Sequence, residues 1–189
     1  MTLFKGKKFS GFTLVELVIT VGITVLLTGV LVIYSQDSRR QILLNVEKGR
    51  ISQAILEVKS LALAGYTAPP TNPPPCSYGM KIDYENQTYY LFEYYPPSGC
   101  SDVMDISSIS ENSLFYRITK EGIIDKDVKF VEHDDSFKYL VFIPPSIKVI
   151  IFKDENTREN FGSLAVYLET KDGTAETKIS ISQSGELSF

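Results

Sequence analysis

The sequence is poor in the residue types from which catalytic and metal sites are commonly built. Among 189 residues there is no tryptophan, one histidine (His133) and two cysteines, Cys76 and Cys100. A single histidine cannot make a two-histidine metal site, and a serine–histidine–aspartate triad would need a serine held against His133. No glycine-rich phosphate loop and no cysteine-rich zinc spacing is present. We therefore predict no catalytic residues, no metal site and no cofactor.

One acidic stretch leaves calcium open as an alternative. Asp125, Asp127, Glu132, Asp134 and Asp135 lie close together in the sequence, and carboxylates are common calcium ligands. Their spacing matches no calcium-binding loop, however, and runs of charge are usually solvated. A solvated polar loop around His133 is the other interpretation.

Basic residues are also scarce. Lysine and arginine number 19 against 23 acidic residues, which gives a net charge of −4. Lys5, Lys7 and Lys8 stand in the first ten residues, and without them the balance is 16 − 23 = −7. No basic patch with interleaved aromatic residues follows. This acidic balance argues against nucleic acid as a partner.

Charge is missing almost entirely from one long run. From Phe12 to Tyr34 the only ionisable side chains are Glu16 and Tyr34 itself, and about 20 apolar residues suit a bilayer-spanning helix. The lysines in front predict that the amino terminus stays in the cytoplasm, so that the rest of the chain lies outside it. Glu16 is the anomaly, because a carboxylate in hydrocarbon costs roughly 2.5 to 3.5 kcal/mol. It needs a partner.

The run Gly11-Phe12-Thr13-Leu14-Val15-Glu16-Leu17, behind its short basic leader, resembles the amino terminus of type IV pilins and type II secretion pseudopilins. The resemblance implies that prepilin peptidase cuts between Gly11 and Phe12 and methylates the new Phe12 amine. It also implies that Glu16 pairs with the terminal amine of a neighbouring subunit and so fixes register during assembly. The alternative is an ordinary signal anchor that carries Glu16 by chance.

Helical periodicity continues beyond the apolar run. Leu44, Ile51, Ile55, Val58 and Ala62 form an apolar stripe that Ala54 and Leu61 widen, whereas Glu47, Lys48, Arg50, Gln53, Glu57 and Lys59 fill the other face. We expect one helix from about Phe12 to about Leu63. The predicted organisation is a cleaved leader (1–11), a membrane or fibre-core helix (12–35), an amphipathic continuation (36–64) and a β-rich head (65–189).

The head is predicted to consist of antiparallel strands behind a proline-rich connector, Thr67–Pro75. Cys76 and Cys100 flank a predicted hairpin over 78–94, so we expect a disulfide, with two separate thiols as the alternative. The tyrosines of this hairpin favour sheet packing over a partner-binding role. Further strands are expected at 114–119, 128–131, 139–143, 148–152, 163–169 and 177–182, with a turn at Lys171–Gly173. The fold class is α+β, a long amino-terminal helix packed on this head.

Parts of the head are similar to the GspH/FimT-like minor pseudopilins, in Tyr78–Met80, Tyr89–Phe92, Phe142–Pro145 and Ile179–Leu187. We therefore predict a minor pilin or pseudopilin, a structural subunit of a type IV pilus or type II secretion pseudopilus. Its implied partners are other pilin subunits, prepilin peptidase, an inner-membrane assembly platform and, before assembly, membrane lipid. The implied location is a single pass through the cytoplasmic membrane with an extracytoplasmic head. The alternatives are a pilus-tip module that binds DNA, a surface or a secreted substrate, and a signal-anchored domain.

Overall fold

The computed structural model describes residues 13–65, 75–95, 100, 116–144, 148–154, 157–159, 163–182 and 184–188. The chain divides into two compact units, residues 1–40 and 41–189. One helix, α1 (Leu14–Gly65), contributes to both units. The predicted α+β class, a long amino-terminal helix with a head of antiparallel strands, is confirmed.

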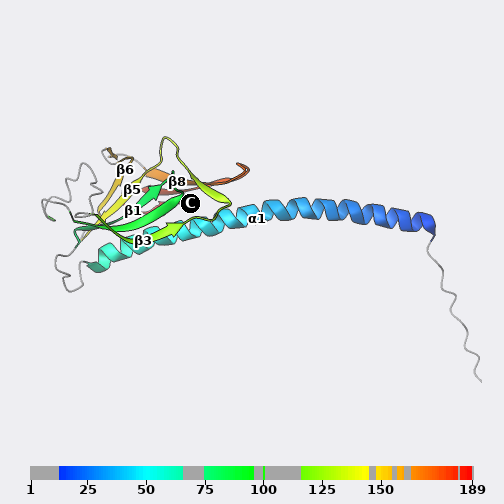
Figure 1. Cartoon of the computed structure of the whole chain (residues 1–189), viewed down its shortest axis with the longest axis horizontal. Coiled ribbons are helices and arrows are strands. Elements are labelled where there is room, and N and C mark those ends of the chain that lie inside the picture. The colour runs from blue at the N-terminus through cyan, green and yellow to red at the C-terminus, as the bar shows by residue number, and fades with distance from the viewer. Residues whose placement is uncertain are drawn as a thin grey trace, which may run out of the picture. The chain divides into compact units, whose positions relative to one another are not determined.

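Within the residues of the head that the structure describes, ten strands form two antiparallel sheets. Figure 1 shows these strands as arrows. The six-stranded sheet has the order β3-β2-β1-β5-β6-β7 and the four-stranded sheet the order β10-β9-β8-β4. The β7 strand was not predicted, and the β3 strand lies a few residues later than expected. The bounds are β1 (Ser77–Asp83), β2 (Thr88–Tyr94), β3 (Tyr116–Ile123), β4 (Val128–Val131), β5 (Tyr139–Ile143), β6 (Lys148–Phe152), β7 (Arg158–Glu159), β8 (Ser163–Thr170), β9 (Glu176–Ser182) and β10 (Leu187–Ser188).

The second half of α1 packs on the head through the predicted apolar stripe. Its five members, Leu44, Ile51, Ile55, Val58 and Ala62, are all at most 4% exposed. Two predictions about this helix were wrong. Leu61 is 38% exposed, because it lies about 100° around the helix from Ala62, and Glu47 is only 3% exposed.

Within the six-stranded sheet, strand β5 is buried on both faces, whereas the edge strand β3 is largely exposed. Along β5, Leu140 and Phe142 join the core that contains the α1 stripe, whereas Tyr139, Val141 and Ile143 belong to a second apolar cluster. Side chains alternate between the faces of a strand, so this division is what the strand period dictates. The four-stranded sheet adds Val166, Leu168, Ile179 and Ile181, among others, to the α1 side of the core.

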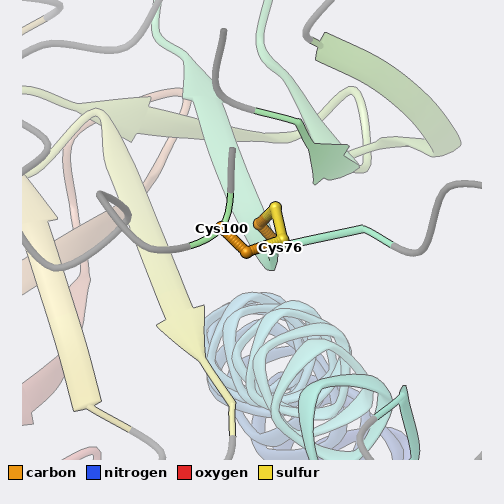
Figure 2. The surroundings of a disulfide bond; sticks show 2 residues. All are labelled: Cys76 and Cys100. Atoms are coloured by element: carbon orange, nitrogen blue, oxygen red, sulfur yellow. A yellow bond between two sulfur atoms is a disulfide. The ribbon is translucent and has the colours of Figure 1, made fainter. Parts of the chain in front are cut away.

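Cys76 and Cys100 form the predicted disulfide, with their Cα atoms 5.0 Å apart (Figure 2). Cys76 comes immediately before β1, and its backbone N–H donates to the Tyr94 carbonyl at the end of β2. The bridge therefore holds residue 100 at the open end of the β1–β2 hairpin. The proline-rich connector, apart from Pro75, lies outside the described residues.

Candidate assembly helix and head surface

Glu16 lies in the first turn of α1 and is tied to Thr13. The Glu16 carboxylate accepts from the Thr13 backbone N–H at 3.5 Å and from the Thr13 hydroxyl at 3.3 Å, while the Glu16 N–H donates to Thr13 Oγ1 at 3.3 Å. This reciprocal arrangement is a capping box, which satisfies amide groups that a helix start leaves open. Gly11 and Phe12, the predicted cleavage and methylation positions, lie outside the described residues.

The Thr13–Glu16 bond was not predicted, although the spacing Thr-x-x-Glu in front of an apolar run is its sequence signal. The bond gives the carboxylate a local partner, but a neutral one. Among the residues of this turn that the structure describes, no cation therefore compensates the negative charge of Glu16. A cation would still be favourable beside it.

The apolar part of α1 contains three threonines at intervals of four residues, Thr20, Thr24 and Thr28. Each of their hydroxyl groups donates a hydrogen bond to a backbone carbonyl of the same helix. Thr20 Oγ1 donates to the Leu17 carbonyl at 2.9 Å, Thr24 Oγ1 to the Thr20 and Val21 carbonyls at 2.9 Å, and Thr28 Oγ1 to the Thr24 carbonyl at 2.7 Å. Bonds of this kind let hydroxyl side chains lie in hydrocarbon or in a tight helix contact. Polar groups on this face therefore do not oppose burial.

One stretch of α1, Leu14–Val32, is long and apolar enough to cross a membrane by length and composition. None of its 19 residues is buried by the part of the chain that the structure describes. Leu14, Leu26, Val30 and Leu31 are each about two-thirds exposed or more, so the surface of this stretch is apolar all round. Such a helix is unstable in water alone and requires lipid or protein around it.

His133 and two acidic residues near it, Asp135 and Glu176, make contacts within the head. His133 Nε2 lies 2.9 Å from Glu176 Oε1, and its ring packs on Tyr167 with the centroids 4.2 Å apart. The Tyr167 hydroxyl donates to Asp135 Oδ2 at 2.7 Å, and this hydrogen bond raises the pKa of Tyr167 to about 12. Among the described residues, no group of three histidine, cysteine, aspartate or glutamate side chains is placed to hold a metal ion.

The tyrosine-rich hairpin packs as predicted. Tyr89 and Leu91 face the core that contains α1, whereas Phe92 and Tyr94 face the second cluster. Phe92 stacks on Tyr116 of the neighbouring strand, with ring centroids 4.4 Å apart. These side chains therefore pack within the head and are not available as a partner-binding surface.

A polar hollow of about 260 Å³ lies beside the β1–β2 turn. Burial tends to raise the pKa of Asp83 at its wall, but hydrogen bonds from Asn86 and from the Glu85 N–H outweigh this effect and lower it. Burial raises the pKa of Tyr84, whose hydroxyl donates to the Phe137 carbonyl at 2.8 Å. The hollow was not predicted, because its lining residues come together only in the fold: Lys81, Asp83, Tyr84, Glu85, Glu132 and Lys138.

Comparison with known proteins gives little beyond this geometry. No protein-family model and no curated protein matches the chain. The chain is similar to the structure of the minor pseudopilin EpsH from the type 2 secretion system of Vibrio cholerae, at 10% sequence identity and a TM-score of 0.47. That likeness covers 77% of this chain and 94% of the other. A likeness of this strength carries no argument about function.

Proposed function

We propose that the chain is a minor pilin or pseudopilin, a structural subunit that prepilin peptidase processes at Gly11–Phe12 and that assembles through its amino-terminal helix. The observation that carries the proposal is the run from Gly11 to Leu17 in front of an apolar helix, Leu14–Val32, none of which is buried among the residues that the structure describes. Before assembly that helix would lie in the cytoplasmic membrane, and afterwards in the core of a fibre. The head would then be extracytoplasmic.

Glu16 has the central role in this proposal. Cleavage before Phe12 would create an α-ammonium, and the same group on a neighbouring subunit is the cation that the uncompensated carboxylate lacks. Two opposite charges that meet in an apolar surrounding fix the register of two helices, because either charge alone is costly there. Nothing in the sequence suggests nucleotide binding, so the work of assembly would come from other components of the machine.

Intact-mass spectrometry of the protein from cells with an active prepilin peptidase tests the processing step. We expect the loss of residues 1–11 and the gain of one methyl group, and we expect the Gly11→Ala variant to keep its leader. An uncut chain in the membrane would refute the proposal and leave a signal-anchored domain.

Two variants of Glu16 separate its two roles. Glu16→Gln keeps an oxygen acceptor for the Thr13 amide but removes the charge, whereas Glu16→Ala removes both. If charge pairing drives assembly, both variants should be processed normally and both should fail to enter fibres. Normal incorporation of Glu16→Gln would mean that capping, and not charge, is what Glu16 supplies.

A further inference from the structure

The polar hollow beside the β1–β2 turn carries charge of both signs. Its lining contains two lysines, Lys81 and Lys138, and three carboxylates, Asp83, Glu85 and Glu132. Its volume of about 260 Å³ is several times the roughly 30 Å³ that one water molecule occupies in the liquid. It is slightly below the roughly 300 Å³ at which pockets for drug-sized ligands begin. The hollow therefore has room for a small polar molecule.

The β1–β2 turn, which forms one wall of the hollow, is fixed by contacts with distant parts of the chain. The Tyr84 hydroxyl donates to the Phe137 carbonyl at 2.8 Å. The Gln87 side-chain amide donates to the Phe130 carbonyl at 3.3 Å, and its oxygen accepts from the Phe130 N–H at 2.5 Å. Gln87 thus bonds to the edge of β4 as a neighbouring strand would. This wall is in place before any ligand arrives, which lowers the cost of binding.

Gln87 makes these bonds from a backbone conformation that residues other than glycine rarely adopt. Its φ is 57°, and among the described residues it is the one non-glycine residue with a positive φ. Such a conformation costs roughly 1 to 3 kcal/mol, and residues that retain it are concentrated at functional sites. The strained turn beside the hollow is therefore an independent sign that this part of the head has a binding role.

A second wall is fixed through the backbone of Lys138. Its N–H donates to the Phe152 carbonyl at 2.9 Å, and its carbonyl accepts from the Ile82 N–H at 2.9 Å. The ammonium groups of Lys81 and Lys138 lie 5.7 and 6.0 Å from the centroid of the Tyr139 ring. Two positive charges thus lie beside one buried ring.

Charge of each sign remains available in the hollow. Among the residues that the structure describes, Glu85, Glu132 and Lys138 form no ion pair. Asp83 differs from them, because its oxygens accept hydrogen bonds within the turn. Glu132 lies near Tyr84 instead: burial raises the pKa of Tyr84, and the negative charge of Glu132 adds to this effect.

A ligand with charge of one sign would meet repulsion here. The lysines disfavour a metal cation, and no group of three described acidic, histidine or cysteine side chains is placed to hold one. The three carboxylates disfavour an anion such as phosphate. An apolar ligand would strip water from charged groups without replacing it. A molecule that carries both charges can instead form a charge-assisted hydrogen bond with each sign.

We propose that this hollow binds a small zwitterion with a free carboxylate and a free ammonium, the chemistry that amino acids and very short peptides share. Lys138 pairs with the ligand carboxylate, and Glu132 pairs with the ligand ammonium. Glu85 and Glu132 are exposed, so water screens these contacts and binding requires millimolar concentrations. The inference goes beyond the proposed function and does not depend on it, because every residue of the site lies in the head.

Saturation-transfer NMR on the full chain in detergent tests the charge requirement. The probes are L-alanine, alanyl-alanine, propionate and ethylammonium, each at the same millimolar concentration. We expect saturation of at least one of the two zwitterions and none of the two singly charged probes. The stronger zwitterion shows whether the site prefers a free amino acid or the ends of a peptide. Equal saturation of propionate or ethylammonium, or no saturation of any probe, would overturn the inference.

Variants of the lining locate the binding. Lys138→Met removes the ammonium and keeps an unbranched side chain, and Glu132→Gln removes the carboxylate charge at nearly the same size. Each should reduce the saturation of the zwitterion by about fivefold or more, because each removes a charge-assisted hydrogen bond. Lys171→Met and Glu186→Gln remove the same charges from exposed positions elsewhere in the head and should leave it unchanged.

Thermal unfolding of the four variants provides the control for folding. Glu132 is exposed, so Glu132→Gln should unfold at the same temperature as the parent chain and decides the test even if Lys138→Met is less stable. Undiminished saturation in a folded Glu132→Gln chain, or an equal loss in Glu186→Gln, would overturn the inference.

Discussion

Glu47 is the residue at which the sequence pattern and the fold disagree most. Its neighbours along the stripe are Leu44 and Ile51, so the helix turns it toward the core despite its charge. Glu47 Oε1 accepts from Arg50 Nη1 at 2.7 Å, whereas Oε2 is buried and meets no hydrogen-bond partner among the described residues. Arg50 remains 48% exposed, so the two partners of this ion pair have unequal access to water.

This inequality predicts opposite effects for the two halves of the pair. Glu47→Met replaces a poorly satisfied buried carboxylate with an apolar side chain of similar length, and Arg50 can hydrate instead, so we expect stability to rise by about 1 kcal/mol. Arg50→Met leaves the carboxylate buried without its cation and should cost about 3 kcal/mol. Denaturant unfolding of the full chain in detergent measures both changes.

Ser60→Ala is the control for the Glu47 and Arg50 variants, because Ser60 is exposed and its hydroxyl only donates to the Glu57 carbonyl of its own helix. Its effect should stay within about 0.5 kcal/mol. If Glu47→Met lost as much stability as Arg50→Met, the Glu47 carboxylate would contribute more to stability than its ion pair with Arg50 explains.

Among the elements, the hairpin β1–β2 and its neighbour β3 depend on two glycines that lie under aromatic rings. Gly79 is the cross-strand partner of Phe92, and Gly122 is the partner of Tyr89. A Cβ at Gly79 would lie 2.2 Å from Phe92 Cζ, and one at Gly122 would lie 2.1 Å from Tyr89 Cζ. Each ring thus covers the bare backbone of the next strand.

Gly79→Ala should therefore destabilise the head by about 1 to 3 kcal/mol, because the Phe92 ring must leave a packed position that is 1% exposed. Gly49→Ala is the matched control of opposite sign. A Cβ at Gly49 would meet no other atom within 4 Å, and a helix favours alanine over glycine by about 0.8 to 1 kcal/mol, so this substitution should raise the stability.

Thermal unfolding of the two glycine variants beside the parent chain gives the comparison. Equal effects of the two substitutions would contradict the ring-over-glycine account.

Several elements could be predicted from sequence because each has a local signal. Strands β4, β5 and β6 have the predicted bounds, since each is a short β-branched or aromatic run between turn residues. The burial of Glu47 and the polar hollow beside Asp83 could not be predicted in this way. Both depend on which face of an element the rest of the chain covers, and β7, two residues long, is too short to carry a periodicity.

At the scale of the whole molecule, one helix, α1, contributes to a core that it shares with both sheets of the head. The same apolar core unites the α1 stripe with residues of both sheets, while the flanking contacts of Lys59 and Glu57 reach the four-stranded and six-stranded sides respectively. The disulfide adds a tie that does not involve the helix. It joins the start of β1 to residue 100, across a sequence separation of 24.

Loss of this disulfide should lower the stability of the whole head, not only of the hairpin that it closes. In the chain-entropy account a loop of this length contributes about 3 kcal/mol by restricting the unfolded chain. Because β1 pairs with both β2 and β5 at the centre of its sheet, unfolding of the hairpin cannot be confined to one edge. The double variant Cys76→Ser, Cys100→Ser should therefore unfold in one transition at a lower denaturant concentration.

Reductant provides the internal control for the disulfide prediction, since it should shift the unfolding of the parent chain toward that of the double variant and leave the double variant unchanged. Hydrogen exchange then locates the effect. Because β1 is a central strand, we expect β1, β2 and β5 to lose protection from exchange to the same extent. A loss restricted to β2 and β3 would mean that the disulfide stabilises only the edge of the sheet. In that case the core around α1 would hold β1 and β5 in place without the disulfide.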